Sequence, residues 1–437
     1  MPGAELSGVE VARADLRSTA RALFEAGVAA ADPADAVRSS LRTAPVEATR
    51  IVAVGKAALA MATAARETLP DAELLVVTNE ENAVAAPPGW RVLVAAHPVP
   101  DAGGAAAARE VEAFAATAGD GETVLVLVSG GGSAMLPAPI EGVSLDDKIA
   151  LTAALLASGA PIDEMNAVRR ALSRLKGGGL ARTIHPARTV ALLLSDVPHD
   201  EIAAIASGPT VPGAKPDEAA RDALRVLGNH GLLARAPEAV RAALEARALE
   251  RAGDAGAAPN VENRLVGGNA LSVRAMHDAA RARGIEAMRM DGWADGDVGI
   301  AAKRMHELAR RAPSPVQAVL MGGETTVRLR GTGQGGRNQE FALRFALECE
   351  ADPLPREWAF VSGGTDGRDG PTDAAGGLVD RTTLSRIEAN GEDARALLAN
   401  NDSYAALKAG DALLMTGATG TNVADLQVLV LGPEVTA

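Results

Sequence analysis

The amino-acid sequence predicts an α/β fold with mainly parallel, helix-flanked sheets. Short runs of Val, Leu, Ile and Ala recur along the 437 residues, and each is followed by a stretch rich in Ala, Arg and Glu. The runs are continuously apolar and do not alternate with polar residues, which is typical of strands covered on both faces. Nearly every run ends in Gly, Ser, Asp or Asn, as strands do where they turn into helices. Together these patterns favour parallel sheets between layers of helices.

The same alternation of apolar runs with Ala-, Arg- and Glu-rich stretches predicts the individual strands and helices. Strands are predicted at residues 50–54, 73–78, 91–96, 123–128, 189–194, 317–321, 358–362 and 412–415. The clearest helices are predicted at residues 9–26, 216–247 (broken near 228–231), 270–284 and 298–312. We expect Gly27 to end the first helix. The stretch A-G-D-A-G-A-A-P-N at 252–260 is typical of a linker, so two domains are predicted, residues 1–256 and 257–437.

Composition narrows the classes of function. The formal net charge is −13, whereas a nucleic-acid surface or an anionic-membrane anchor needs a basic excess. The single cysteine, Cys349, excludes an intrachain disulfide and a cysteine-rich metal site. The sequence has no apolar run of about 20 residues, and its first 24 residues lack the pattern of a signal peptide. We therefore expect a cytoplasmic protein with small-molecule partners, without nucleic-acid or membrane partners, and compatible with an oligomer.

A glycine-rich turn is the main functional signal. Residues 129–133 read S-G-G-G-S (Ser129, Gly130, Gly131, Gly132 and Ser133) and directly follow the predicted strand 123–128. Open α/β sheets bind ligands at the carboxyl ends of their strands, and glycine N–H groups can approach a phosphate closely. A tight strand-to-helix connection explains one such turn equally well. Because several predicted strands end in similar turns that also carry charged residues, binding of an anion is favoured.

Two common nucleotide signatures are missing. The sequence contains neither G-x-x-x-x-G-K-[ST] nor a G-x-G-x-x-G that follows a first strand. A Walker-type or NAD-type site is therefore not supported.

Three charged residues stand in the turns after predicted strands, and a fourth, Arg337, follows a glycine-rich stretch and precedes an apolar helical run. Lys56 and Arg337 are suited to binding a phosphoryl group or a carboxylate. Asp196 ends a buried run, where an Asp can accept a hydroxyl proton or hold Mg²⁺. Glu324, in G-G-E-T, is placed similarly. A solvated lysine at a helix start and an aspartate that caps a turn remain the plain structural alternatives.

A second acidic group follows the strand predicted at 358–362. Asp366 and Asp369 lie in G-T-D-G-R-D-G, with Asp373 shortly after. Their carboxylates have the chemistry that Mg²⁺ prefers. Asp-Gly pairs also form turns with no ligand at all, so both interpretations stay open.

These motifs, taken in order, resemble one family. The sequence is similar to the bacterial and archaeal glycerate 2-kinases, long also labelled hydroxypyruvate reductases, whose C-terminal part is called the MOFRL domain. In the first half the matching stretches are V-G-K-A-A (54–58), H-P-V-P-D (97–101), S-G-G-G-S-A (129–134), N-A-V-R-R (166–170), L-K-G-G (175–178), L-S-D-V (194–197) and A-S-G-P-T (206–210). In the second half they are G-G-E-T-T-V (322–327), G-G-R-N-Q-E-F (335–341), S-G-G-T-D-G (362–367), D-G-P-T-D (369–373), N-N-D-S (400–403) and T-G-A-T-G-T-N (416–422).

The resemblance implies an activity and roles for these residues. It implies two α/β domains with an active site in the cleft between them, ATP as donor, glycerate as acceptor and 2-phosphoglycerate as product. Lys56 and Arg337 match the family's catalytic lysine and arginine, Asp196 matches its acidic position, and residues 129–133 match a ligand-binding turn. Met135 stands where the pattern usually has Leu, which is a mild change.

The sequence thus predicts a Mg²⁺-dependent glycerate 2-kinase. Asp196 would orient or deprotonate the 2-hydroxyl, while Lys56 and Arg337 would stabilise charge on the phosphoryl group and the glycerate carboxylate. Residues 129–133 and Glu324 would bind the nucleotide, and Asp366 and Asp369 the metal. An NAD(P)H-dependent hydroxypyruvate reductase is the alternative, which the missing dinucleotide signature disfavours. A metabolite sensor without turnover is a third hypothesis, and the cluster of charged groups disfavours it.

Overall fold

The structure, a computed structural model, describes residues 8–83, 86–250, 259–313 and 315–435. They form two compact units. We call residues 33–195 and 201–266 the N-terminal unit, and residues 8–32, 196–200 and 267–435 the C-terminal unit. This division differs from the predicted boundary after residue 256, because the first helix and the segment 196–200 pack with the C-terminal unit. The linker predicted at 252–260 lies mostly outside the described residues.

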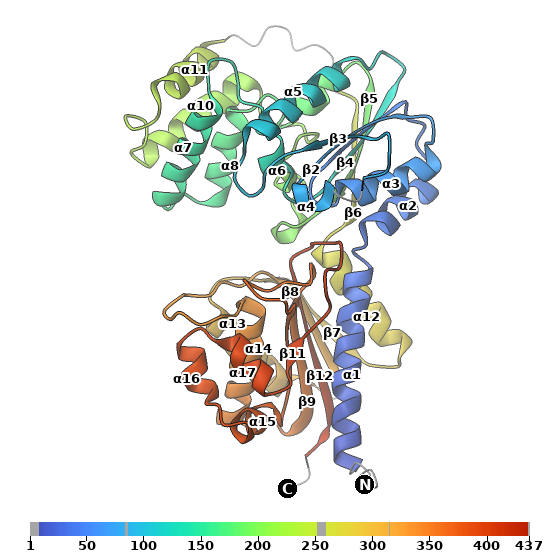
Figure 1. The fold of residues 1–437 in the computed structure, drawn as a ribbon, viewed down its shortest axis with the longest axis vertical. Coiled ribbons are helices and arrows are strands. Elements are labelled where there is room, and N and C mark those ends of the chain that lie inside the picture. Colours follow the sequence, from blue (N-terminus) through green and yellow to red (C-terminus); the bar gives the residue numbers. More distant parts are fainter. Residues whose placement is uncertain (1–7, 84–85, 251–258, 314, 436–437) are drawn as a thin grey trace. The chain divides into compact units, whose positions relative to one another are not determined.

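The N-terminal unit is built on a six-stranded sheet in the order β3-β2-β1-β4-β5-β6 (Figure 1). The strands are β1 (Arg50–Val54), β2 (Glu73–Thr78), β3 (Arg91–Val94), β4 (Thr123–Val128), β5 (Arg188–Leu194) and β6 (Val261–Gly267). The α-helices are α2 (Pro33–Thr43), α3 (Ala58–Thr68), α4 (Glu80–Ala83), α5 (Ala102–Ala116), α6 (Gly132–Met135), α7 (Leu145–Ala157), α8 (Ile162–Ala171), α9 (Gly179–Ile184), α10 (Pro216–Asn229) and α11 (Glu238–Leu249). A short 3₁₀ helix, η2, spans Ile205–Ser207.

This sheet confirms the predicted parallel arrangement. β1 pairs in parallel with β2 and β4, β2 pairs so with β3, and β4 with β5. Beyond their first residues β1 and β4 are wholly buried, as their continuous apolar sequences predict. The chain runs outward from β1 to β3 and returns to the other side of β1 with β4. The direction of winding therefore reverses between β1 and β4, and the carboxyl ends of these strands flank the crevice where such sheets bind ligands.

A separate helical core completes this unit. Helices α7, α8, α10 and α11 contribute its buried residues, among them Leu151, Val168, Val226 and Leu244. The helix predicted at 216–247 is interrupted near residues 228–231, as expected, and becomes α10 and α11.

The C-terminal unit contains a second six-stranded sheet, in the order β11-β10-β9-β12-β8-β7. The strands are β7 (Ala287–Ala294), β8 (Ala318–Gly323), β9 (Arg356–Gly364), β10 (Gly376–Asp380), β11 (Leu413–Leu414) and β12 (Asp425–Glu434). The helices are α1 (Gly8–Ala29), η1 (Pro198–Asp200), α12 (Asn269–Ala282), α13 (Val298–Arg311), α14 (Arg337–Ala351), α15 (Thr383–Ala389), α16 (Ala394–Ala399) and α17 (Ser403–Ala409). No helix in the described ranges is both long and apolar enough to cross a membrane.

This second sheet is mixed, which differs from the predicted parallel arrangement. Only β7 and β8 pair in parallel, whereas β8–β12, β12–β9, β9–β10 and β10–β11 are antiparallel. Strands buried on both faces carry the same continuous apolar runs in either orientation. The apolar runs therefore predicted that β8 and β9 exist but carried no information on their direction.

Helices cover both faces of the mixed sheet (Figure 1). On one face α1 and α12 pack on the strands through residues such as Phe24 and Met276. On the other, α13 and α14 form the larger core. Gly27 does not end α1 as expected: a Cβ there would lie 2.7 Å from Leu426 Cδ1 of β12. Glycine at this position allows the helix to approach the sheet closely.

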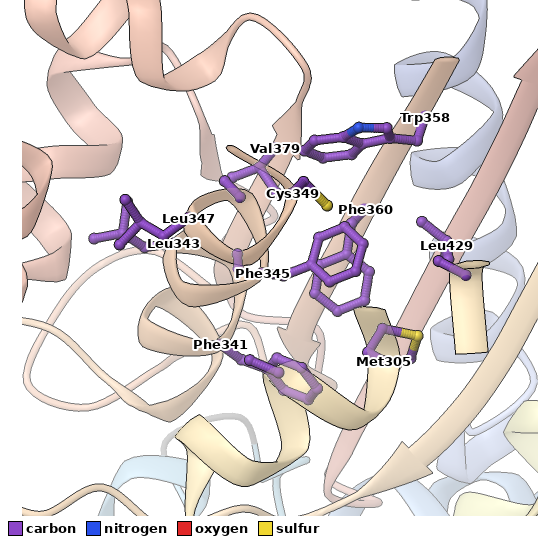
Figure 2. Close-up of a cluster of buried hydrophobic side chains, with 14 of the residues drawn as sticks. Met305, Phe341, Leu343, Phe345, Leu347, Cys349, Trp358, Phe360, Val379 and Leu429 are labelled. Carbon is purple, nitrogen blue, oxygen red and sulfur yellow. The ribbon is translucent and has the colours of Figure 1, made fainter. Parts of the chain in front are cut away.

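Aromatic side chains are few in this chain, and four of the nine lie together in the larger core (Figure 2). The ring of Phe345 on α14 lies 4.5 Å from that of Phe360 and 5.2 Å, edge-on, from that of Trp358, both on β9. Phe341, one turn earlier on α14, contacts Phe360 at 5.3 Å. These contacts fix the position of α14 on the sheet, and therefore the position of Arg337 at its first residue.

We expect Phe345→Ala to lower the free energy of unfolding by about 3–5 kcal/mol, because it removes a fully buried ring. Urea denaturation followed by tryptophan fluorescence measures this, since Trp358 packs on the ring. Leu329→Ala, at a side chain that is 83% exposed, is the control and should change that free energy by less than about 0.5 kcal/mol. Equal effects of the two substitutions would contradict the assignment of the core.

Candidate active-site residues

The loops after β1 and β4 are joined by hydrogen bonds. The Lys56 N–H donates to the Gly130 carbonyl at 2.9 Å, and the Ala57 N–H donates to Ser129 Oγ at 3.0 Å. Gly55 has φ +120°, and a Cβ there would lie only 2.3 Å from Ser129 Oγ. Glycine is therefore required at this position, and Ser129 serves mainly to join the two loops. The sequence predicts that Lys56 and the glycine-rich turn each follow a strand, and the structure shows that these two strands are neighbours.

The side chain of Lys56 and the backbone N–H groups of the glycine-rich turn lie at the same edge of the sheet. The half-buried Lys56 makes no side-chain hydrogen bond or ion pair with any residue that the structure describes. A Cβ on Gly131 would lie 3.3 Å from Lys56 Cγ and 3.1 Å from His97 Cδ2, so all three residues are neighbours. Burial and the charge of Lys56 lower the pKa of His97. Within the same described residues, the N–H groups of Gly130 and Gly131 have no acceptor. This arrangement is suited to binding an anion.

Ser133, at the far end of the turn, is held by a buried lysine. Lys176 Nζ donates to the Ser133 carbonyl at 2.5 Å and to Ser133 Oγ at 2.7 Å. Ser133 Oγ also lies 3.0 Å from Ser207 Oγ. Burial, together with the charges of Lys148 and Arg169, lowers the pKa of Lys176 well below its usual value. The residue pattern favours an anion-binding and a structural role for Lys176 equally, and the structure shows it supporting the turn.

In the C-terminal unit, Arg337 begins α14 and forms a network with two carboxylates. Its Nε and Nη2 bind the two oxygens of Asp425 at 2.6 and 2.9 Å, and its Nη1 lies 3.0 Å from Glu324 Oε1. Burial acts to lower the pKa of Arg337, but the hydrogen bonds and charge of Asp425 outweigh it and raise that pKa. Burial raises the pKa of Asp425, although Arg337 opposes it. Arg337 is thus a permanently charged, oriented cation.

These residues line a small, mostly polar pocket of about 130 Å³. Its lining residues are Asp196, Glu324, Arg337, Gly364, Asp366, Asn422, Ala424 and Asp425. Four of the predicted site residues therefore come together: Asp196, Glu324, Arg337 and Asp366. Asp196 reaches this pocket because the segment 196–200 after β5 belongs to the C-terminal unit. A pocket of this size is suited to a small polar molecule or an ion and not to a whole nucleotide.

Asp369 lies apart from that pocket and caps a helix. Its Oδ1 accepts from the Asn338 N–H at 3.1 Å and its Oδ2 from the Gln339 N–H at 2.8 Å, which satisfies the free amides at the start of α14. Burial raises the pKa of Asp369 to about 6. No group of three or more metal-ligating side chains forms a metal site in the described ranges. The geometry favours a positioning role for Asp369, and Asp366 alone of the predicted metal pair lines the pocket.

The raised pKa of Asp369 predicts a stability change with pH. Because the folded protein keeps this proton to higher pH than the unfolded chain does, stability falls as pH rises from about 4 to about 6. Relative to Asp369→Asn, the free energy of unfolding of the wild type should fall by roughly 3 kcal/mol over that window. Urea denaturation of both proteins at a series of pH values measures the difference. Parallel pH profiles would show that the carboxyl group titrates normally.

Sequence reasoning missed Asp425, the principal partner of Arg337. It begins β12, a strand that was not predicted, and stands between V-A and L-Q-V in the sequence. One signal was present, because Asp425 follows the T-G-A-T-G-T-N stretch by three residues. Asn422, the last residue of that stretch, also lines the pocket.

Comparison with known proteins shows the family to which the chain is similar. Residues 19–245 match the model described as Domain of unknown function (DUF4147), and residues 317–425 match the MOFRL family. A D-glycerate 2-kinase of Thermotoga maritima is 39% identical over 419 residues, covering 94% of this chain and 97% of its own. A crystal structure of glycerate kinase from Thermotoga maritima superposes with a TM-score of 0.87 at 38% identity, covering 96% of this chain and all of its own. A relative from Agrobacterium vitis, whose name gives a hydroxypyruvate reductase only provisionally, is 40% identical over 95% of this chain and 94% of its own.

Proposed function

The chain belongs to the glycerate kinase family and is a glycerate kinase, and we propose that it uses ATP to phosphorylate the 2-hydroxyl of glycerate. The observation that carries this proposal is the unpaired, half-buried Lys56 beside the vacant N–H groups of Gly130 and Gly131 in the described part of the chain. Phosphoryl transfer depends mainly on positioning and on stabilisation of negative charge, and these groups supply both.

The reaction assigns a step to each residue. The 2-hydroxyl oxygen attacks the γ-phosphorus, the bond from that phosphorus to the bridging oxygen breaks to give ADP, and Asp196 accepts the hydroxyl proton. Lys56 stabilises charge on the transferring phosphoryl group, and the N–H groups of the glycine-rich turn bind its oxygens. Arg337, held in place by Asp425, binds negative charge on the phosphoryl group or the glycerate carboxylate. Glu324 helps to orient Arg337.

The small pocket of the C-terminal unit fits Mg²⁺ by the chemistry of its donors. Asp366 presents carboxylate oxygens there and Asp196 also lines the pocket, whereas Glu324 and Asp425 are both engaged by Arg337. Mg²⁺ prefers such hard oxygen donors and keeps several of its waters. When bound, it neutralises charge on the nucleotide phosphates. We propose Asp366 as its main protein ligand, with Asp369 supporting the same loop through α14.

A coupled assay tests the activity. ADP formation from ATP and glycerate is followed with and without Mg²⁺, and ³¹P and ¹H NMR of the product separate 2-phosphoglycerate from 3-phosphoglycerate. We expect glycerate-dependent ADP formation and the 2-isomer. Oxidation of NADH or NADPH by hydroxypyruvate at a comparable rate would favour a reductase, and formation of the 3-isomer would refute the proposed position.

A double-mutant cycle tests whether Lys56 and Arg337 serve one reaction step. Residues that act as a unit have strongly non-additive effects on kcat. We expect the variant carrying both Lys56→Met and Arg337→Met to be about as slow as the slower single variant. If the two losses multiply, the residues act independently and the shared role is refuted.

A further inference from the structure

A second, larger pocket lies in the N-terminal unit and is rich in cations. It has a volume of about 510 Å³ and is bounded by the end of α8, the loop 173–177, the loop 211–216 and the first turns of α10. Five basic residues line it, namely Arg170, Arg174, Lys176, Arg182 and Arg247. In a chain with a formal net charge of −13, such a concentration of positive charge calls for an explanation.

Four of these cations lack an acidic partner among the described residues. Arg182 Nη1 donates to the Gly177 carbonyl at 3.0 Å, Arg247 Nη1 donates to the Ala171 carbonyl at 3.1 Å, and Lys176 binds Ser133. The side chain of Arg170 has no hydrogen bond or ion pair with the residues described. Only Arg174 is neutralised locally, through Glu112. We call Arg170, Arg182 and Arg247 the cation cluster, and we leave out Lys176 because its amino group is buried against Ser133 and its pKa is lowered well below the usual value.

The carboxylates at the rim do not compensate the cation cluster. Asp222 binds Arg225 on its own helix, and Glu218 accepts from the Lys215 N–H at the start of α10. Burial lowers the pKa of Arg182, and the charge of Arg247 lowers it further, which shows that these two cations repel each other. Like charges gathered in a partly buried pocket raise its free energy unless an anion binds there.

The pocket has the size and polarity of a nucleotide site. Its volume is within the range of pockets that bind ligands of several hundred daltons, and it is far larger than inorganic phosphate requires. The side chains of Ala167, Val211, Pro212, Pro216 and Ala219 also line the pocket and form an apolar surface, which we call the apolar wall. A molecule with a flat apolar part and a polyanionic part can pack on the apolar wall and bind the cation cluster at the same time. The 130 Å³ pocket around Arg337 has neither that size nor that apolar wall.

The pocket is also connected to the glycine-rich turn. Lys176 and Ser207 line the pocket, and both contact Ser133 at the end of that turn. Lys176 and Ser207 therefore connect the lining of this pocket to the segment that carries the N–H groups of Gly130 and Gly131.

We propose that this pocket binds the donor nucleoside polyphosphate, with phosphates on the cation cluster and the base on the apolar wall. The proposal deepens the function proposed above and rests on it for the identity of the nucleotide as donor. It assigns nucleotide affinity to Arg170 and Arg182, two residues outside the small pocket of Arg337.

Titration of the full-length protein with ADP and with a non-hydrolysable ATP analogue, by calorimetry, tests this without turnover. Arg170→Gln and Arg182→Gln each remove one charge-assisted contact and should weaken nucleotide binding roughly 10-fold. The matched control is Arg188→Gln, because Arg188 is exposed in the same unit and pairs with Glu262. In steady-state assays the two pocket variants should raise the KM for ATP while kcat and the KM for glycerate stay within about twofold of the wild type.

The outcomes separate this proposal from the proposed function. Nucleotide affinity equal to that of Arg188→Gln in both pocket variants would overturn the pocket assignment and leave glycerate phosphorylation standing. The pocket assignment is also overturned if the variants lose affinity only for inorganic phosphate or pyrophosphate. If instead nucleotide binding depends on Arg170 and Arg182 but the wild type phosphorylates no glycerate, the pocket is confirmed and the proposed function fails.

Discussion

Lys56→Met is expected to lower kcat for phosphoryl transfer by about 100-fold to 1000-fold, the usual cost of removing one charged group that stabilises a transition state. The reason lies in the surroundings of Lys56. Its ammonium group has no structural partner in the part of the chain that is described, so its charge is available to a ligand. For the same reason the free energy of unfolding should change by less than about 1 kcal/mol.

Initial-rate kinetics and urea denaturation measure the two effects side by side. Lys303→Met is the matched control, since Lys303 is an exposed lysine on α13 and the same charge is lost there. Lys56→Arg should recover part of the lost rate, because it keeps the charge but changes the position of the donors. A near-wild-type kcat/KM in Lys56→Met would remove Lys56 from the mechanism.

Arg337→Met should abolish most activity and also destabilise the protein. It leaves Asp425, 1% exposed, without its counter-ion, and breaking one side of a buried ion pair costs several kcal/mol. We expect roughly 3 kcal/mol here, at the low end of that range, because the Arg337 side chain keeps 35% of its exposure. Chemical denaturation monitored by circular dichroism gives the stability, and the coupled assay gives the rate.

A second substitution separates the two roles of Arg337. Adding Asp425→Asn to Arg337→Met removes the uncompensated buried charge, so most of the lost stability should return. Activity should not return, because the cation that binds the substrate is still missing. Recovery of both properties in the double variant would mean that Arg337 serves only to neutralise Asp425.

The parts that the sequence predicted well are encoded locally. β2 and β4 have the predicted bounds, because continuous apolar runs flanked by turn residues carry the signal within a few positions. The sequence also predicted that Lys56 and the glycine-rich turn follow strands of a parallel sheet, whose carboxyl ends share one edge, but the adjacency of β1 and β4 comes from the structure. The gathering of Asp196, Glu324, Asp366 and Arg337 was suggested only by the family resemblance, and the structure places all four at one pocket.

The parts that the sequence did not predict depend on contacts far along the chain. Asp425 becomes the partner of Arg337 only because β12 inserts between β8 and β9, a pairing that no local pattern reveals. Asp369 carries a carboxylate of the kind that binds metals, yet both of its oxygens accept hydrogen bonds from N–H groups at the start of α14. Vacant donors beside Lys56 and unpaired cations around Arg182, as found in the described residues, are likewise properties of the assembled units.

The chain order of the C-terminal unit has a consequence for biosynthesis. Helix α1 leaves the ribosome before either sheet, whereas β12, which it packs against, is made only after the N-terminal unit has been completed. The apolar side chains of Leu23 and Phe24 therefore stay exposed until nearly all of both units has been translated. During that time the nascent chain depends on chaperones or on transient contacts for protection from aggregation. A gene fragment that begins at residue 257 would encode a sheet with one face covered by α12 but without α1, and we would not expect its product to stay in solution.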